Sequence, residues 1–250
     1  MNESGNTILV TGGTSGIGRA LAHEFHALDN RVIVTGRRKA LLDEVTAAHP
    51  GMVGYVLDVD DPTAIRDFAT MATSKHPDLN VLLNNAGIMP IEDLTADVVD
   101  VSAAEAVIAT NLLAPIRLTA ALLPHLRRRA RSAVINVSSG LAFVPLAITP
   151  TYNATKAAIH SYTMSLRRQL RETSVEVIEI VPPGVQTDLM PGMADNPNMM
   201  PLHEFIAETM AVFRQKPTPS EIKVKTVGFL RDAEAEGRFE RTFETLNGSH

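Results

Sequence analysis

Three polar residues in the middle of the chain have a spacing that suits proton transfer. Ser139 precedes Tyr152 by thirteen residues, and Lys156 follows Tyr152 by four. Residues at i and i+4 of a helix share one face, so Tyr152 and Lys156 are expected to lie one turn apart. An ammonium near a phenol favours the phenolate, so we predict that Lys156 lowers the pKa of Tyr152 from its usual value of about 10. Such a phenol could donate or accept a proton at neutral pH.

Ser138 is the alternative to Ser139 as the polar partner of Tyr152. Both serines follow the apolar run Ala133–Val137, and neighbouring residues at the end of a strand point to opposite faces. The spacing to Tyr152 favours Ser139. No G-x-S-x-G sequence surrounds Ser139, which argues against a hydrolase.

A glycine-rich turn near the amino terminus could hold a dinucleotide beside the tyrosine. It follows the β-rich run Thr7–Val10 and precedes a helical pattern. Glycines let the backbone approach a pyrophosphate, and the helix N-terminus supplies N–H groups and a favourable dipole. No Lys-Ser/Thr pair follows the glycines, so the turn is not a Walker loop. The predicted cofactor-binding residues of this turn are Gly12, Thr14, Ser15, Gly16, Ile17 and Gly18.

The end of the second predicted strand, 32–35, indicates which dinucleotide binds. NAD sites commonly carry an acidic residue there for the adenine ribose, whereas this chain has Arg37, Arg38 and Lys39. Arginine can hold a phosphate with two parallel hydrogen bonds, so NADP(H) is predicted as the preferred cofactor and NAD(H) as a weaker one. Arg37 is the expected main contact and Arg38 the second. The alternative is a solvated basic helix start, although cations are unfavourable at a helix N-terminus.

Short apolar runs that alternate with helical patterns would position these residues. The expected strands are 7–10, 32–35, 53–57, 81–83, 133–137 and 175–181. This alternation predicts an α/β fold in three layers (α/β/α), with a Rossmann-like, doubly wound parallel sheet and helices on both faces. We expect one domain over 1–250. A seventh strand at 222–227 is left open because a helix start also fits, and the tail after Ser220 otherwise reads as helix.

The segment from Gly184 to about Pro219 is rich in Pro and Met and shows no regular pattern. A stretch of this length inside a compact domain is usually a lid or a binding loop, so we expect a substrate lid at about 184–219. Met side chains adapt to varied shapes, and an apolar lid would accept a hydrophobic ketone. The predicted substrate contacts are Ser139, Leu141, Phe143, Leu146 and Met190.

Composition argues against several other classes of protein. The net charge is −5 and the pI is about 5.9, so no general basic surface for nucleic acid is present. The chain has no Cys, and no His pair has metal-ligand spacing, so we predict no metal site. His160 is expected to pack or to lie at an interface. No stretch approaches 18 consecutive apolar residues, and the polar amino terminus lacks signal-peptide features, so we expect a cytoplasmic location with no membrane contact.

Together these motifs resemble the short-chain dehydrogenase/reductase family in its single-domain form. The resemblance covers residues 7 to about 190 and rests on Thr11–Gly18, Asp58, Asn84–Gly87, Asn111, Ser139, Tyr152, Lys156, Pro183-Gly184 and Thr187. The strings 91–94, 111–117 and 205–209 are similar to the DltE-like branch of that family. The name of that branch links it to the D-alanylation of cell-wall polymers.

The resemblance implies a role for each matching residue. Tyr152 would be the general acid in ketone reduction and the general base in alcohol oxidation. Ser139 would hold the substrate oxygen, and Lys156 would hold the nicotinamide ribose. A homodimer or homotetramer through helices 103–129 and 150–172 is also expected. The remaining cofactor-binding residues implied are Asp58, Val59, Asn85, Ala86, Gly87, Pro183, Gly184, Val185 and Thr187, together with Tyr152 and Lys156.

Asn111 has a physical account of its own. Pro115 lies four residues later inside a helical pattern and has no N–H, so the Asn111 carbonyl would lose its intrahelical partner. In the family the corresponding oxygen holds a water that connects the lysine to solvent. The resemblance therefore implies that Asn111 is a fourth catalytic residue. The alternative is an ordinary, tolerated proline kink.

The sequence thus predicts an NADPH-dependent carbonyl reductase that interconverts a hydrophobic ketone and a secondary alcohol. Tyr152 and Ser139 would bond the carbonyl oxygen, and Tyr152 would protonate it as the alkoxide forms. Two alternatives are an NADP-binding regulatory protein without turnover and a cell-envelope accessory protein of DltE-like type.

Overall fold

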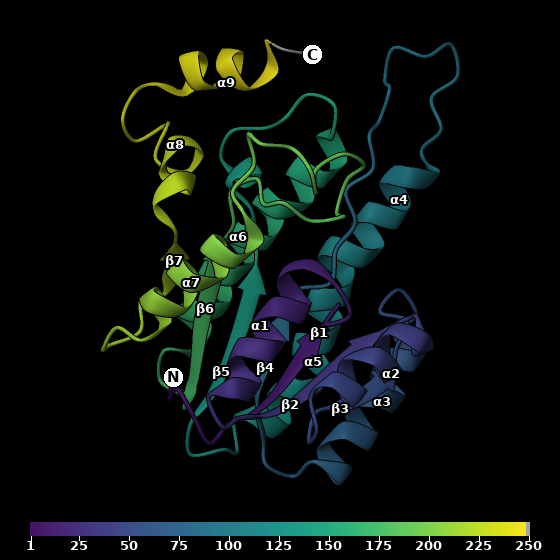
Figure 1. The fold of residues 1–250 in the computed structure, drawn as a ribbon, viewed down its shortest axis with the longest axis vertical. Coiled ribbons are helices and arrows are strands. Elements are labelled where there is room, and N and C mark those ends of the chain that lie inside the picture. The colour runs from purple at the N-terminus through teal and green to yellow at the C-terminus, as the bar shows by residue number, and fades with distance from the viewer. Residues whose placement is uncertain (249–250) are drawn as a thin grey trace.

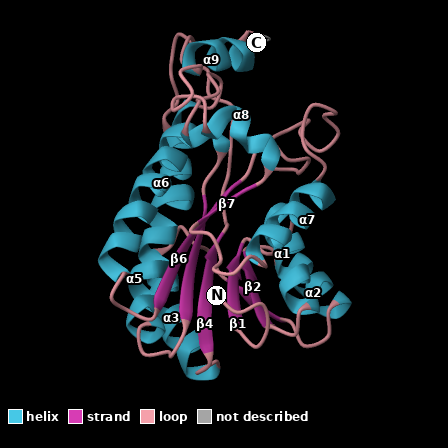
Figure 2. Ribbon diagram, turned by 90° about the vertical axis from the view of Figure 1, so that its left-hand side faces the viewer, coloured by secondary structure: helices cyan, strands magenta, loops and turns pink. Residues whose placement is uncertain are grey.

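Parallel strands and helices alternate along the chain and form one sheet between two helical layers (Figures 1 and 2). The computed structural model describes residues 1–248. The strands are β1 (Thr7–Thr11), β2 (Arg31–Gly36), β3 (Val53–Val56), β4 (Leu79–Asn84), β5 (Ser132–Val137), β6 (Val175–Val181) and β7 (Glu221–Lys223). Their order is β3-β2-β1-β4-β5-β6-β7, with every neighbouring pair parallel. The order reverses between β1 and β4, where doubly wound sheets bind ligands.

The helices cover both faces of the sheet because the central strands are apolar on both sides. In β1, Ile8 and Val10 belong to one core and Leu9 to the other, since successive side chains of a strand point in opposite directions. The first core is closed by α1 (Gly16–Ala27), α2 (Lys39–Ala48) and α7 (Leu202–Phe213). The second is closed by α3 (Pro62–Lys75), α5 (Ala114–Leu126) and α6 (Pro150–Leu170). The predicted three-layer fold is confirmed.

The seventh strand, which the sequence left open, is present at the edge of the sheet. Residues Glu221–Lys223 of β7 pair with Glu179–Val181 of β6. Its three residues are too few for the alternation of Lys with apolar side chains to distinguish a strand from a helix start. The tail after Ser220 is therefore not helical at its start, although α8 (Gly228–Arg231) and α9 (Phe239–Asn247) follow.

The segment predicted as an irregular lid, 184–219, contains a regular helix. Helix α7 occupies Leu202–Phe213, and Phe205, Met210 and Phe213 are buried against α1 and the sheet. The high Met content drew attention to a loop, whereas the helical spacing of these side chains marks a core-facing helix. The irregular stretch is residues 184–201, and its ends are held together where Val185 pairs with Met200.

The long helix predicted over 103–129 is divided by a π-helical turn. Helix α4 (Ser102–Ile108) leads into the turn Ala109–Leu113, and α5 follows and ends at Leu126. Pro115 lies in the first turn of α5, where a missing N–H is tolerated. The turn has the i→i+5 bonding of a π-bulge, since the Ala114 N–H donates to the Ala109 carbonyl.

The stretch Ser102–Leu126 is also long and apolar enough to cross a membrane by length and composition alone. Core helices of this composition pass the same test. Here Leu118, Leu122 and Leu126 are buried in the core beneath the sheet, which is the packing of a core helix.

The carboxyl-terminal helix α9 lies over the carboxyl end of the sheet (Figure 1). Its Phe239 and Phe243 pack with Val144, which belongs to the loop between β5 and α6. The Asn247 side chain accepts a hydrogen bond from the Ala147 N–H at 2.6 Å and donates one to the Pro145 carbonyl at 3.1 Å. Helix α9 therefore fixes the loop that connects Ser139 to Tyr152.

Candidate active site

Ser139, Tyr152 and Lys156 meet at the carboxyl end of β5. Ser139 follows this strand, and α6 carries Tyr152 and Lys156 on one face. All three side chains are buried, and the Ser139 hydroxyl interacts with the Tyr152 phenol. The Leu141 N–H donates to Ser139 Oγ at 3.1 Å. Lys156 Nζ lies 5.4 Å from the centroid of the Tyr152 ring and donates to the Val137 carbonyl at 2.9 Å.

The predicted lowering of the Tyr152 pKa is wrong in direction. Burial raises the pKa of Tyr152 to about 12, and the Ser139 hydroxyl offsets only part of this effect. Burial also lowers the pKa of Lys156 to about 8. Desolvation penalises the charged form of each group, which raises the pKa of the phenol and lowers that of the ammonium. Tyr152 therefore keeps its proton at neutral pH, which is the form that a general acid needs.

The two adjacent serines point to different parts of the structure. Ser138 is buried, and its Oγ donates to the Ile180 carbonyl of β6 at 3.3 Å. Ser139 instead interacts with Tyr152. This divergence is the geometry expected for neighbouring residues at the end of a strand.

Asn111 lies in the π turn and holds the segment that follows β4. Its amide accepts a hydrogen bond from the Ile88 N–H and donates one to the Ile88 carbonyl, both at 2.9 Å. Its amide nitrogen also donates to Thr155 Oγ1 at 3.4 Å, and Thr155 precedes Lys156 on α6. The structure thus brings Asn111 to the catalytic helix through its side chain. The water-holding role of its backbone carbonyl stays a prediction.

The glycine turn closes tightly against the residues after β4. Gly12 has a φ of +65°, and a Cβ there would lie 2.9 Å from the Ala86 Cα, so only glycine fits. A Cβ on Gly18 would overlap the Asn85 side-chain amide. Thr11 Oγ1 accepts hydrogen bonds from the N–H groups of Asn85 and Ala86 at 3.0 and 3.1 Å, which ties β1 to β4.

This cradle fits a dinucleotide. The first turn of α1 contains no acidic residue, and its N-terminus suits a pyrophosphate. Ser15 occupies the N-cap position of α1, Ile17 lies in its first turn, and Thr14 is buried against Gly36. A Cβ at Gly12 or Gly18 would clash with neighbouring residues. These glycines therefore form the part of the turn that would hold the phosphate oxygens.

The segment after β6 reaches the same cradle. A Cβ on Gly16 would lie 3.5 Å from the Thr187 side chain, so Thr187 faces the glycine turn. Gly184 follows Pro183 and packs closely against the Met199 sulfur, and Val185 is buried. Gly87 lies on the opposite side, where a Cβ would be 3.3 Å from Asn111 Oδ1.

Arg37 and Arg38 lie at the rim of the site, directly after β2. The Arg37 side chain is 63% exposed, and its guanidinium is 4.0 Å from the Asp60 carboxylate. An exposed ion pair of this length contributes little free energy, so Arg37 is available to a phosphate. Arg38 holds the N-cap position of α2, while Lys39 pairs with Asp43 one turn later at 2.6 Å.

Asp58 and Val59 follow β3 near this rim. Asp58 Oδ1 accepts a hydrogen bond from the Asp60 N–H at 3.1 Å, which closes a tight turn, and Val59 is largely buried in the second core. Asp60 also accepts a hydrogen bond from Thr110 Oγ1 at 2.7 Å. The turn thereby connects the predicted adenine end of the site to the π turn.

An apolar cluster of side chains surrounds Tyr152. Of the predicted substrate contacts, Leu141 and Met190 belong to it, and Phe143 and Leu146 do not. The Phe143 ring lies instead between the His160 ring, at 4.7 Å, and the Arg231 guanidinium, at 4.2 Å. The cluster also contains residues that the sequence did not predict, namely Met89, Val107, Leu189, Met193 and Met199. Their side chains come from three separate segments, so no local pattern marks them.

Two polar contacts in the core were also missed. His160 Nδ1 lies 2.9 Å from the carboxylate of Glu179, which is fully buried in β6. Asn136 accepts a hydrogen bond from the Asn84 amide at 2.8 Å and donates one to Thr163 at 2.9 Å. An Asn inside the apolar run of β5 was the available signal for the second contact, because a buried amide needs partners.

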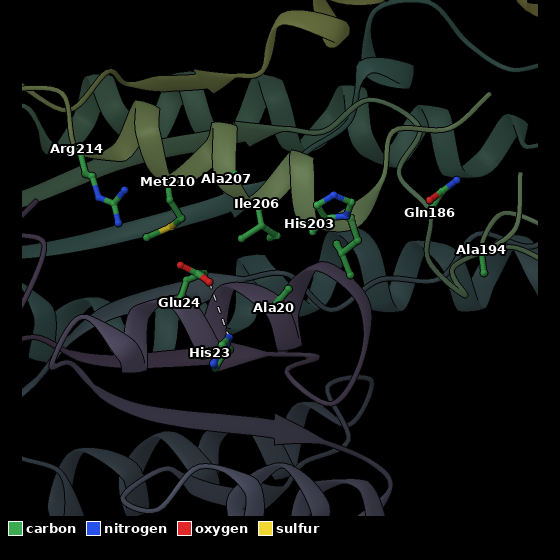
Figure 3. A pocket seen from close by; sticks show the side chains of 11 residues that line it. Ala20, His23, Glu24, Gln186, Ala194, His203, Ile206, Ala207, Met210 and Arg214 are labelled. Atoms are coloured by element: carbon green, nitrogen blue, oxygen red, sulfur yellow. Dashed lines mark ion pairs between the residues drawn. The ribbon is translucent and has the colours of Figure 1, made fainter. Parts of the chain in front are cut away.

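A cavity lies away from Tyr152, between α1 and α7. It has a volume of about 670 Å³. Figure 3 shows side chains of α7, among them Ile206 and Met210, facing Ala20 and Glu24 of α1. Its remaining lining residues are His23, Gln186, Ala194, Leu202, His203, Ala207 and Arg214. Ser139, Tyr152 and Lys156 do not line this cavity.

Comparison with known proteins agrees with this geometry. A family model described as short chain dehydrogenase matches residues 6–198. The chain is 39% identical over 249 residues to the "Uncharacterized oxidoreductase DltE" of Bacillus subtilis, covering 99% of this chain and 98% of that protein. It is 35% identical over 180 residues to the "NADP-dependent 3-hydroxy acid dehydrogenase YdfG" of Salmonella typhi, covering 70% and 71%.

A solved structure extends the similarity to the whole fold. A short-chain dehydrogenase from Streptomyces avermitilis superposes with a TM-score of 0.81 at 26% identity, covering 98% of this chain and 96% of the other. The resemblance read from the sequence, including its DltE-like branch, is therefore confirmed. The chain belongs to the short-chain dehydrogenase family and is an NAD(P)-dependent oxidoreductase.

Proposed function

We propose that the protein is an NADPH-dependent carbonyl reductase that acts on a hydrophobic ketone or aldehyde. The observation that carries this proposal is the position of Tyr152, buried beside Ser139 in an apolar cluster, where burial raises its pKa to about 12. A protonated phenol suits the reductive direction, because it can give its proton to an oxygen that becomes an alkoxide. Oxidation of an alcohol needs the phenolate, which the raised pKa disfavours at neutral pH.

Each catalytic side chain has a distinct task. The Leu141 N–H occupies one lone pair of Ser139 Oγ, so the Ser139 hydroxyl acts as a donor, to the Tyr152 phenol in this structure and to a carbonyl oxygen when substrate binds. Tyr152 donates a second hydrogen bond to the same oxygen and then transfers its proton. Lys156 would hold the ribose hydroxyls of the nicotinamide nucleotide. Bound NADPH supplies the hydride that reduces the carbonyl carbon.

The preference for NADP(H) over NAD(H) rests on Arg37 and Arg38. Both follow β2, and Arg37 has only a weak ion pair to exchange for a phosphate. Guanidinium groups bind phosphate oxygens in pairs, which favours the 2′-phosphate. The NADP-dependent relative from Salmonella typhi supports the same choice.

The proposed substrate class rests on the apolar cluster around Tyr152. Met89, Met190, Met193 and Met199 contribute flexible apolar side chains, which adapt to varied shapes. The chain has no Arg or Lys over 139–155 to anchor a small carboxylate. A hydrophobic carbonyl compound therefore fits better than a hydroxy acid.

We also propose a cytoplasmic homodimer or homotetramer that assembles through Ser102–Leu126 and α6. Met164 of α6 and Leu113 of the π turn are exposed apolar residues that such an interface would cover. The absence of Cys agrees with a reducing compartment.

The test is the oxidation of NADPH with a panel of apolar ketones, aldehydes and small keto acids. Wild-type protein should reduce the apolar carbonyls, and Tyr152→Phe should lose about 10²–10⁴-fold in kcat while it binds NADPH normally. NADPH binding by both proteins is measured by fluorescence. Turnover by Tyr152→Phe near the wild-type rate would refute the role of the phenol. Binding without turnover by wild-type protein would favour a regulatory function.

A further inference from the structure

The string Ile91-Glu92-Asp93-Leu94, which marks the resemblance to the DltE-like branch, has a side chain that reaches the catalytic helix. Thr151 donates to the Glu92 carboxylate twice, from its N–H at 3.0 Å and from its hydroxyl at 2.7 Å. The Glu92 N–H in turn donates to the Ile148 carbonyl at 2.9 Å. Two hydrogen bonds thus join Glu92 to the first turn of α6, at the residue before Tyr152, and a third joins it to the loop that precedes the helix.

Helix α6 depends on this contact because its own residues do not cap it. Its N-cap residue, Thr149, makes no side-chain capping bond. The Thr149 hydroxyl interacts instead with the Leu146 carbonyl and with Asn153 Oδ1. Pro150 has no N–H, so the first N–H of the helix belongs to Thr151. A carboxylate is well suited to that N–H, because it also complements the positive end of the helix dipole.

The same contact fixes a segment that contributes to the apolar cluster around Tyr152. Residues 88–92, here called the strap, are held at the start by the two Asn111–Ile88 hydrogen bonds and at the end by Glu92. Between these ends, Met89 is buried in the apolar cluster that contains Tyr152. The strap therefore has two fixed ends and one side chain against the catalytic phenol.

Beyond Glu92 the chain leaves the body of the protein. Residues 93–101 form the loop that projects before α4 (Figure 1), and Leu94, Val98 and Val101 are exposed. The hydrogen bonds of Asp93 within this loop go to Thr95, two residues away. Among the hydrogen bonds of the described residues, those of Glu92 are therefore the last that join this part of the chain to α6.

We infer that Glu92 is a positioning residue for the proposed reduction. It caps α6 from a distant segment, so that the phenol of Tyr152 is held toward the carbonyl oxygen, and it fixes the strap that contributes to the apolar cluster. The inference rests on the proposed function. A displacement of about 1 Å at a reacting group can cost about 100-fold in rate, so a lost cap at the residue before Tyr152 should be visible in turnover.

The test compares Glu92→Ala, Glu92→Gln and Asp97→Ala. Glu92→Ala should lose about 10- to 100-fold in kcat/KM for the ketone, while the KM for NADPH stays unchanged. Glu92→Gln should restore much of the activity, because its amide oxygen can still accept from the Thr151 N–H. Asp97→Ala removes an exposed charge from the same projecting loop and should behave as wild type.

A second readout does not depend on turnover. Hydrogen exchange followed by mass spectrometry should show faster exchange of the first turn of α6 and of residues 93–101 in Glu92→Ala, and no change in Asp97→Ala. If wild-type protein reduces no carbonyl, the proposed function fails, and the exchange experiment still tests the cap. Unchanged exchange and unchanged kcat/KM in Glu92→Ala would overturn the inference.

A folding defect would not leave the question open. If Glu92→Ala fails to bind NADPH, Thr151→Val removes only the side-chain bond to Glu92 and leaves the backbone N–H in place. Thr151→Val should then show a smaller loss of kcat/KM with normal NADPH binding. Wild-type turnover by Thr151→Val, together with unchanged exchange in α6, would equally overturn the inference.

Discussion

The carboxyl end of the sheet is built differently in two places. The first edge is where β1, β2 and β4 end, and the second edge is where β5 and β6 end. At the first edge, Gly12, Gly18 and Asn85 lie so close that backbone and short side chains form the cradle. At the second edge, side chains from the strap, the β5–α6 loop and residues 184–201 converge on Tyr152. The proposed cofactor side is thus a compact turn formed by residues close in sequence, and the proposed substrate side is an assembly of distant segments.

This difference explains where each half tolerates change. A Cβ at Gly12 meets the backbone of Ala86 at 2.9 Å, which cannot move without opening the sheet edge. Met190 and Met199 are flexible side chains that can repack around a different substrate. Substitutions on the cofactor side should therefore affect every substrate equally, whereas substitutions on the substrate side should change specificity.

Of the predictions that follow, the largest effect is expected at the two serines. Ser139 serves the proposed catalysis, and Ser138 serves packing. Ser139→Ala should lower kcat for ketone reduction by about 10²–10³-fold, because it removes a donor to the developing oxyanion. Ser138→Ala removes only the bond to Ile180 and should lower the free energy of unfolding by about 1 kcal/mol with near-normal kcat. Steady-state kinetics and thermal unfolding of both variants check this. Equal losses of kcat would show that both serines act structurally.

An intermediate effect is expected at the rim of the cofactor side. Arg37→Asp should weaken NADPH binding by roughly 10–100-fold, since a charge-assisted contact to the phosphate is replaced by repulsion. NADH binding should change little. Fluorescence titration with both dinucleotides measures the ratio, and Arg66→Asp on the exposed face of α3 is the matched control. Equal weakening of NADPH and NADH would contradict the proposed phosphate contact.

The smallest effect is a pH dependence that links the two sides at Lys156. Burial lowers the pKa of Lys156 to about 8, so its ammonium is lost as the pH rises through that value. Tyr152, with a pKa of about 12, keeps its proton over the same range. The rate of ketone reduction should therefore fall in a single step as the pH rises through about 8. In Lys156→Arg this fall should occur at a higher pH. If the rate of Lys156→Arg falls at the same pH as that of wild-type protein, another group causes the fall.

Stability should change in the opposite direction to activity. Between pH 8 and 10 the unfolded chain holds the Lys156 proton and the folded chain has released it. Stability rises with pH wherever the unfolded state binds more protons, so this group makes the protein more stable as the pH increases through that window. Thermal unfolding across the window should show the rise in wild-type protein, and Lys156→Met should abolish it.

The strand, glycine turn and helix at the amino terminus could be predicted from the sequence because their determinants are local. Strand, glycine turn and helix follow one another within residues 7–27, and the cradle forms wherever that order folds. The pKa of Tyr152 was misjudged because burial comes from residues such as Met89 and Met193, which are far away in the chain. Helix α7 was not predicted because its segment has a Pro- and Met-rich composition that is typical of loops. Strand β7 was left open because it has only three residues. Contacts such as those of Glu92 with Thr151, 59 residues apart, have no local signature.

The π-helical turn at Ala109–Leu113 has a consequence for the alignment of related chains. A π turn contains one residue more than an α-helical turn of the same height, so it behaves as a single-residue insertion inside a helix. Deleting one residue there would restore an uninterrupted helix from Ser102 to Leu126 but rotate Asn111 by about 100° away from Ile88. Relatives with an unbroken helix should therefore show a one-residue gap at this point, and they would need a different residue to anchor the strap.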